Sequence, residues 1–269
     1  MLKDITIGQY FPMDSAVHRL DARFKIVITA IFIVMIFTAD SFAALCLPIV
    51  FFFIAFGASK LSFKLILKSM KSIIPVIILT SLLNIFFIEG VTVFEIFGIS
   101  ISDNGLITSG FMVIRLVALI CGSSLLTYTT SPIVLTDAIE QMLKPLGKLH
   151  FPVHELAMMM TIALRFIPTL IEETDKIMSA QKARGADMDS GTIIERAKAL
   201  GPVIIPLFVS SFRRAEELAL AMECRCYNGG EGRTKLKTLV SGGADYAALC
   251  LSLLFLCGVL IMNMGKIVL

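Results

Sequence analysis

Two arginine residues in the second half of the chain have surroundings that suit docking to another protein. Each stands between two small residues at the end of a predicted amphipathic helix, in Ala183-Arg184-Gly185 and in Cys224-Arg225-Cys226. Small neighbours let a helix end approach its partner closely, while the guanidinium group donates paired hydrogen bonds to carboxylate or carbonyl oxygens. The helix dipole favours a cation there by about 0.3–1 kcal/mol, but it does not account for small residues on both sides. Two such ends predict two docking points on a dimeric or pseudo-dimeric cytosolic partner.

Other polar groups lack the spacing that catalysis or metal binding needs. The glycine-rich segment 229–235 has neither the G-x-x-x-x-G-K-[ST] order nor the preceding strand of a phosphate-binding loop. His150 and His154 are four residues apart, but a proline lies between them and no cysteine or carboxylate pair completes a zinc set. Glu172 and Glu173 could be the paired carboxylates of a membrane hydrolase, although a solvated helix face is the favoured interpretation. We therefore predict no catalytic residue, no metal site and no cofactor bound by this chain.

Arg115 is a further candidate because it interrupts a long apolar run. It lies nine residues into that run, which predicts a position near the middle of the bilayer. An arginine there costs roughly 2.5–3.5 kcal/mol even on lenient insertion scales. It must therefore face protein, water or a carboxylate, for which Asp40, Glu89 and Asp245 are candidates. Two interpretations stay open at this point: a substrate or ion path, and a packing contact between helices or with another protein.

The composition indicates the kind of fold that must hold these residues. Of the 269 residues, 57% are hydrophobic and only 17% are charged, whereas soluble chains are usually less than half apolar and about one quarter charged. A soluble fold of this length cannot bury so much apolar surface. The net charge of +3 is too small to suggest nucleic acid as a partner. We predict an all-α integral membrane protein.

Apolar runs predict about five transmembrane helices. A span needs roughly 20 apolar residues, with about 17 as a practical minimum, so the first three runs are short. The five runs are Ile26–Ala39, Phe42–Gly57, Ile73–Ile88, Leu106–Thr127 and Tyr246–Met262.

The orientation of these spans follows from the distribution of lysine and arginine. Lysine or arginine residues occur before the first run, between the second and third (lysine only), and between the fourth and fifth, and neither type occurs in the other two loops. Since cytoplasmic loops carry the excess of such cations, we predict a multi-pass protein of the cell (plasma) membrane with a cytosolic N-terminus. The chain then divides into a four-span membrane domain (1–127), a cytosolic-face domain (128–243) and a last transmembrane helix (244–269).

The large insertion between the last two spans predicts three amphipathic helices. The first begins at Ser131-Pro132, the second runs from Pro152 to Arg184, and the third opens with the capping box of Thr192 and Glu195. Two stretches in these helices are apolar but short. Prolines interrupt both stretches, and an arginine also interrupts the first one. We expect them to lie against the membrane face and one another rather than to cross the bilayer. The two stretches are Leu156–Ile171, with Arg165 and Pro168, and Ala199–Phe212, with Pro202 and Pro206.

Several separate stretches, in order along nearly the whole chain, carry a resemblance to a known family. The sequence resembles the transmembrane (T) component of energy-coupling factor (ECF) transporters, a branch of the ABC importers, in the type shared by several substrate-binding subunits. The matching stretches are Gly8-Gln9-Tyr10, Asp14-Ser15, His18-Arg19-Leu20-Asp21, Arg23, Thr129-Thr130-Ser131-Pro132, Leu135-Thr136-Asp137, Pro152–Ala157, Ala163–Thr169, Gln181–Ala186, Pro206–Phe208, Phe212–Ala215 and Ala221-Met222-Glu223 before Arg225.

The resemblance implies a role for both arginine triplets. They would be the coupling motifs that dock into grooves of two cytosolic ATPases, with ATP and Mg bound by those partners and not by this chain, which would not be an enzyme. The second motif departs from the family pattern, which usually has Ala-Arg-Gly, sometimes Ala-Arg-Ser. Because cysteine is poor at positive φ, we expect the third helix to run past Cys226 to Gly229.

The resemblance also implies a second partner in the membrane. The long helices would carry ATPase motion to a substrate-binding S component that takes up a vitamin or other micronutrient. Prolines can bend helices and methionine surfaces adapt to different partners, so we expect Pro168, Pro202, Pro206 and Met158, Met159 and Met160 to flex or to face the S component. The rival hypothesis is a stand-alone secondary transporter or channel that uses Arg115 in its own pathway.

Overall fold

The computed structural model describes residues 10–71, 73–88, 92–96, 99–145, 152–186, 192–229 and 239–267. These residues fall into two compact units. The membrane unit comprises residues up to Leu135 together with those from Leu239 onward, and the insertion unit comprises residues from Thr136 to Thr238. The predicted all-α fold class is confirmed, and one short hairpin is added to it.

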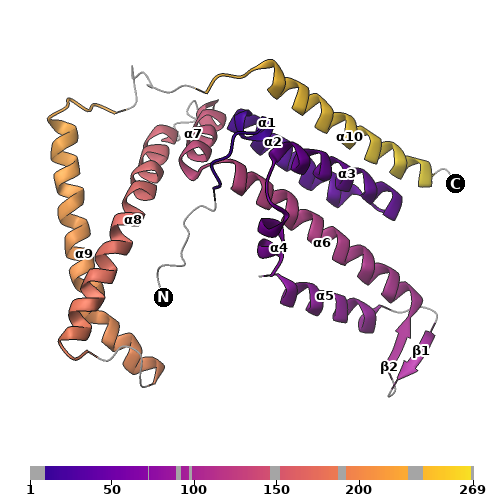
Figure 1. Ribbon diagram of the computed structural model, residues 1–269, viewed down its shortest axis with the longest axis horizontal. Coiled ribbons are helices and arrows are strands. Elements are labelled where there is room, and N and C mark those ends of the chain that lie inside the picture. Colours follow the sequence, from indigo (N-terminus) through magenta and orange to yellow (C-terminus); the bar gives the residue numbers. More distant parts are fainter. Residues whose placement is uncertain are drawn as a thin grey trace. The chain divides into compact units, whose positions relative to one another are not determined.

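The membrane unit contains most of the helices labelled in Figure 1. A proline or a side-chain cap marks several of their starts; for example, Ser41 and Ser102 each accept a hydrogen bond from a backbone N–H one turn later. The two strands pair antiparallel between α5 and α6. The elements are α1 (Ala16–Arg19), α2 (Ala22–Thr38), α3 (Phe42–Ser59), α4 (Phe63–Lys71), α5 (Ile74–Phe87), β1 (Thr92–Ile96), β2 (Ile99–Ser102), α6 (Asp103–Thr129) and α10 (Gly243–Ile267).

Helix α2 lies at the centre of this unit and contacts α3, α6 and α10. Its Phe32, Met35 and Ile36 are buried in the core, together with residues from the three neighbouring helices. The backbone of α6 comes close to α2 at Gly122, where an added Cβ would overlap the Phe32 ring. A glycine is therefore required at this crossing.

Within the described ranges, four helices are long and apolar enough to cross a membrane, namely α3, α6, α8 and α10, and the bent pair of α4 and α5 makes a fifth if it counts as one span. The first predicted span corresponds to α2, which at 17 residues is slightly shorter than these helices. The third corresponds to α5, to which α4 is joined at a bend of 62°. The assignment of individual helices to the bilayer stays a prediction.

The insertion unit contains the three predicted helices, α7 (Pro132–Leu143, which begins at the boundary between the units), α8 (Val153–Ala183) and α9 (Ile193–Glu223). The predicted second helix, from Pro152 to Arg184, is confirmed, because α8 continues through both Arg165 and Pro168. A proline inside a helix removes one backbone hydrogen bond, and the remaining turns of this 31-residue helix are enough to continue it. α9 likewise passes through Pro202 and Pro206.

Candidate functional site: two arginine-tipped helices

Helices α8 and α9 form an antiparallel pair held by polar contacts. Arg214 Nη2 of α9 donates to Glu173 Oε2 of α8 at 2.6 Å, and the hydroxyl group of Ser210 donates to the other oxygen of the same carboxylate. Gln181 Nε2 donates to the carbonyl group of Pro202 at 3.5 Å. Across these contacts, residue numbers increase along α8 while they decrease along α9. The two helices therefore run in opposite directions, and they cross, as Figure 1 shows.

This arrangement sends the two arginine triplets to opposite ends of the pair. At 1.5 Å per residue, Arg184 lies about 16 Å beyond the Glu173 contact in one direction. Arg225 lies about 22 Å beyond Ser210 in the other direction by the same measure. The two triplets are thus separate points on one helix pair.

The end of α8 is a Schellman cap, a turn in which two backbone N–H groups close back onto the last helical carbonyls. The Gly185 N–H donates to Lys182 O at 3.0 Å, and the Ala186 N–H donates to Gln181 O at 3.0 Å. Gly185 has φ of +86°, the left-handed value that this cap requires. Arg184 is therefore the last residue before the turn, and its side chain is exposed.

The end of α9 repeats this cap residue for residue. The Cys226 N–H donates to Glu223 O at 2.8 Å, and the Tyr227 N–H donates to Met222 O at 3.0 Å. Cys226 has φ of +54°, so Arg225 occupies the position that Arg184 has in the first cap. The expectation that α9 continues to Gly229 is wrong, because the backbone turns at Cys226 despite the steric cost of a side chain there.

All six residues of the two triplets are exposed. Neither guanidinium group is buried in the core of the insertion unit, and the caps leave both helix ends available for contact. In each cap, an arginine flanked by two small residues thus has the same backbone conformation. Sequence reasoning identified the arginines but not the cap that orients them.

The strain at Cys226 gives a testable difference between the two caps. We expect Cys226→Gly to stabilise the end of α9 by about 1 kcal/mol, because glycine adopts positive φ without a steric penalty. Gly185→Ala should destabilise the end of α8 by a similar amount, since no other atom lies within 4 Å of the added methyl group and only the backbone angle matters. Hydrogen–deuterium exchange of the cap amides measures both effects, as about fivefold slower and fivefold faster exchange. Equal exchange in wild type and Cys226→Gly would contradict the strained cap.

The remaining predicted residues of the insertion unit lie on exposed helix faces. Met159 and Met160 are about half exposed, and Met158 is partly buried. The three prolines, Pro168, Pro202 and Pro206, are also exposed. On α9, Phe208 and Phe212 stack with their ring centroids 6.4 Å apart and leave more than 60% of each residue accessible.

The alternative candidates in this unit are engaged in packing or lie outside the described residues. Glu173 accepts hydrogen bonds from Ser210 and Arg214, so its carboxylate joins α8 to α9. His154 Nδ1 lies 3.1 Å from Glu140 Oε1, which joins α8 to α7. His150 and the glycine-rich residues from 230 onward lie outside the described residues.

Arg115 in the membrane unit contacts the end of another helix. Its Nη2 donates to the carbonyl group of Ala39, directly after α2, at 2.5 Å. Its guanidinium carbon lies 4.6 Å from the centroid of the Phe111 ring, a cation–π contact. The Asn263 amide group of α10 donates to the neighbouring carbonyl group of Thr38. Arg115 and Asn263 together satisfy carbonyl groups that the end of α2 leaves without helical partners.

The guanidinium group lies beside the end of α2, and the hydrogen-bond partner that the structure gives it is the Ala39 carbonyl group. Asp245 is not its partner, since that carboxylate accepts hydrogen bonds from the backbone N–H groups of Asp21 and Gly242. Glu89 lies outside the described residues, and the contacts favour the packing interpretation over a transport path.

Replacing Arg115 by leucine tests that interpretation. We expect a loss of about 1–3 kcal/mol in stability, because the Ala39 carbonyl group is left without a hydrogen-bond donor. Transport per folded molecule should stay within about twofold of wild type, in contrast to the result for a residue in a transport path. Thermal unfolding in detergent and uptake normalised to folded protein measure the two quantities. Normal stability with abolished uptake would contradict the packing role.

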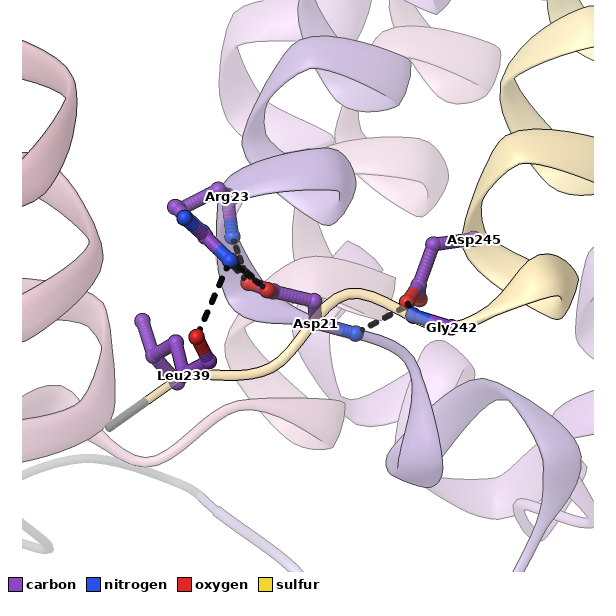
Figure 2. A network of polar contacts seen from close by, with 5 residues as sticks. All are labelled: Asp21, Arg23, Leu239, Gly242 and Asp245. Carbon is purple, nitrogen blue, oxygen red and sulfur yellow. Dashed lines mark hydrogen bonds and ion pairs between the residues drawn. The ribbon is translucent and has the colours of Figure 1, made fainter. Parts of the chain in front are cut away.

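A second polar site joins the chain that returns from the insertion unit to the start of α2 (Figure 2). Asp245, in the first turn of α10, accepts from the Asp21 N–H at 2.8 Å and from the Gly242 N–H at 2.7 Å. Arg23 forms a two-pronged ion pair with Asp21 and also donates to the carbonyl group of Leu239 at 3.2 Å. We call this network of five residues the return anchor.

The return anchor also sets the electrostatics of Asp21. Burial acts to raise the pKa of this carboxyl group, but hydrogen bonds from the Arg23 side chain and backbone, with the charges of Arg23 and Lys25, outweigh it. The net pKa lies below the ordinary value, so the carboxylate is ionised near neutral pH. The sequence analysis did not predict this network. Asp245 did carry a signal, because an acidic residue in the first turn of a helix is typical of a side chain that binds free backbone N–H groups there.

The apolar helices and the exposed, arginine-tipped pair define a multi-pass membrane protein with a separate helical unit. The sequence profile of the cobalt transport protein family, CbiQ, matches residues 13–236. An energy-coupling factor transporter transmembrane protein EcfT from Thermosediminibacter oceani is 53% identical over 92% of this chain and 93% of its own length. Proteins of the same name from Clostridium kluyveri and Bacillus subtilis are 53% and 48% identical, over 96% and 91% of this chain and 96% and 93% of their own lengths. The chain belongs to this family of ECF transporter transmembrane components, which confirms the resemblance found in the sequence.

Proposed function

We propose that this chain couples ATP hydrolysis in two cytosolic ATPase subunits to vitamin or micronutrient uptake through a separate S component in the membrane. The observation that carries the proposal is the pair of matching caps, each with an exposed arginine, at opposite ends of α8 and α9. Two identical local structures on one element suit a partner with two similar grooves. This chain itself binds neither ATP nor the transported substrate.

The contacts between α8 and α9 support the transmission of motion. The Glu173 carboxylate is held by Ser210 and Arg214, so a displacement at one end of the pair is carried to the other helix. The exposed methionine and aromatic side chains give the pair an apolar surface that an S component could contact. The distribution of lysine and arginine favours a cytosolic N-terminus in the cell membrane, an orientation in which this unit would lie on the same side as the ATPases.

Protection of thiol groups tests the docking directly. We expect a water-soluble maleimide to label Cys224 at least tenfold more slowly in the assembled transporter than in the isolated chain, because an ATPase groove covers the cap. Ala183→Cys occupies the matching position of the first cap and should be protected in the same way. Each cysteine is tested as the only one in its chain.

The control is a cysteine on α9 away from both caps, at the exposed position of Arg213. When ATPases are added to the isolated chain, the labelling rate of this control cysteine should change little, whereas the labelling rates at both caps should fall. Labelling rates at both caps that are unaffected by the ATPases would overturn the docking proposal.

A further inference from the structure

A hollow of about 280 Å³ lies inside the membrane unit beside α3 and α10. One half of these helices is in contact: the rings of Phe51 and Phe255 have centroids 5.5 Å apart, and Leu47 lies 3.3 Å from the position of a Cβ at Gly258. The hollow begins where this contact ends. It extends toward the end of α3 and the beginning of α10.

The walls of the hollow are almost entirely apolar. Small side chains line it on the two helices that separate, Ala55 and Ala58 on α3 and Ala248 on α10. Ile28 and Phe32 of α2 line its inner wall. A side chain larger than alanine at the small positions would fill the space, so the sequence at these positions keeps it open.

The few polar groups in the walls already have protein partners. The Lys25 ammonium group donates to the carbonyl groups of His18 at 3.2 Å and Thr129 at 3.0 Å and to the Thr130 hydroxyl group at 3.4 Å. The Thr29 and Thr129 hydroxyl groups each donate, at 2.8 Å, to a carbonyl group one turn earlier in their own helices. A buried water molecule needs two to four polar partners, whereas the three donors of Lys25 are already used and the two threonine hydroxyl groups can offer only acceptor lone pairs.

An apolar ligand is therefore the natural occupant of the hollow. An unfilled apolar cavity destabilises a protein in proportion to its volume, and a cavity of about 150 Å³ lined by Leu, Ile and Phe already binds benzene. The hollow is nearly twice that size and lies among helices apolar enough to span a membrane. The ligand available there in excess is a lipid acyl chain.

The edge of the hollow is open on the side of the same two helices. Ile54, Ala58, Ala244 and Leu251 line it and are exposed. Lys60 is exposed and caps the end of α3, two residues beyond Ala58. A cation beside an apolar hollow matches a phospholipid with an anionic headgroup.

We propose that the hollow holds one acyl chain of an anionic phospholipid, whose phosphate group lies near Lys60. The lipid would fill the wedge between α3 and α10 and so form part of the packed structure of the membrane unit. This proposal does not depend on the docking of ATPases.

Native mass spectrometry of the transporter, released from nanodiscs of phosphatidylglycerol and phosphatidylcholine, tests this site. We expect wild type to retain one phosphatidylglycerol per copy of this chain. Ala248→Phe fills the hollow and should lower that retention at least tenfold. Lys60→Gln should keep the acyl chain but lower the preference for phosphatidylglycerol over phosphatidylcholine about fivefold, the contribution expected of one lysine at an anionic surface.

The matched control is Ala247→Phe, on the same helix at an exposed position outside the hollow. It should retain lipid like wild type. If Ala248→Phe does not fold, Ala55→Leu provides a smaller filling substitution with the same expected loss. Wild type without retained lipid, which would also result if a partner subunit filled the hollow, overturns the proposal, as does equal retention in the filled and control variants.

Discussion

Replacing both Arg184 and Arg225 by alanine is expected to reduce uptake to the background level and to abolish copurification of the ATPase subunits. Both side chains are exposed on matching caps, so the loss comes from the interface and not from the fold. Truncating one partner of a buried, hydrogen-bonded charge pair at an interface typically costs about 2–5 kcal/mol. Loss of both contacts would then lower ATPase affinity by more than about a thousandfold. Single substitutions should each leave measurable but reduced uptake.

Two further variants separate docking from a general loss of positive charge. Arg213→Ala removes an exposed arginine from α9 at a distance from either cap and should leave uptake and copurification unchanged. Replacing both cap arginines by lysine keeps the positive charge but removes the planar guanidinium group with its paired donors. This variant should therefore keep only part of the ATPase binding. Unchanged uptake in the double alanine variant, with the chain present at its normal level, would refute the coupling role.

The ends of the insertion helices could be predicted from the sequence because local signals mark them. Pro132 begins α7, Thr192 directly precedes α9, and Gly185 follows α8. Each signal acts within one turn of backbone, so no knowledge of the rest of the fold is needed. The apolar runs predicted the membrane helices for a similar reason, since their length and composition are properties of a continuous segment.

The geometry at Cys226 could not be predicted in this way. Local preference favours a continued helix at a cysteine, whereas the structure turns there with the same hydrogen bonds as at Gly185. The partners of Arg115 and Asp245 were also out of reach. Their contacts join residues 76 and 224 positions apart, and such pairs depend on how helices pack rather than on local spacing.

Replacing Asp21 by alanine is the second change for which we expect a large effect. The Asp21 side chain is only 1% exposed and accepts hydrogen bonds from the side chain and backbone N–H of Arg23. Removing one partner of a buried ion pair costs about 3–5 kcal/mol. For a chain of this size that corresponds to a fall of about 6–12 °C in Tm. Uptake should fall as well, because Arg23 also holds Leu239, where the chain returns from the insertion unit.

Acid should remove the contribution of Asp21. Its pKa is lowered in the folded protein, so the folded state binds fewer protons than the unfolded state near the ordinary pKa of about 3.9. The stabilisation is therefore fully present above that pKa and is lost as the pH falls through the lower, folded value. Thermal unfolding of wild type and Asp21→Asn should show a constant difference between about pH 6 and 7 that shrinks as the pH falls below about 4. A difference that does not depend on pH would rule out the ionised carboxylate as its source.

The chain offers a matched control for the return anchor in a second aspartate–arginine pair. Arg19 donates to Asp14 through two nitrogen atoms, at 2.8 Å each, but both side chains are about three-quarters exposed. An exposed pair contributes about 0–1 kcal/mol because water screens it and competes for its hydrogen bonds. Asp14→Ala should therefore change Tm by less than about 3 °C and leave uptake intact. Since the two pairs share their chemistry and differ in burial, equal effects of Asp14→Ala and Asp21→Ala would show that the buried anchor has no special part in holding the returning chain.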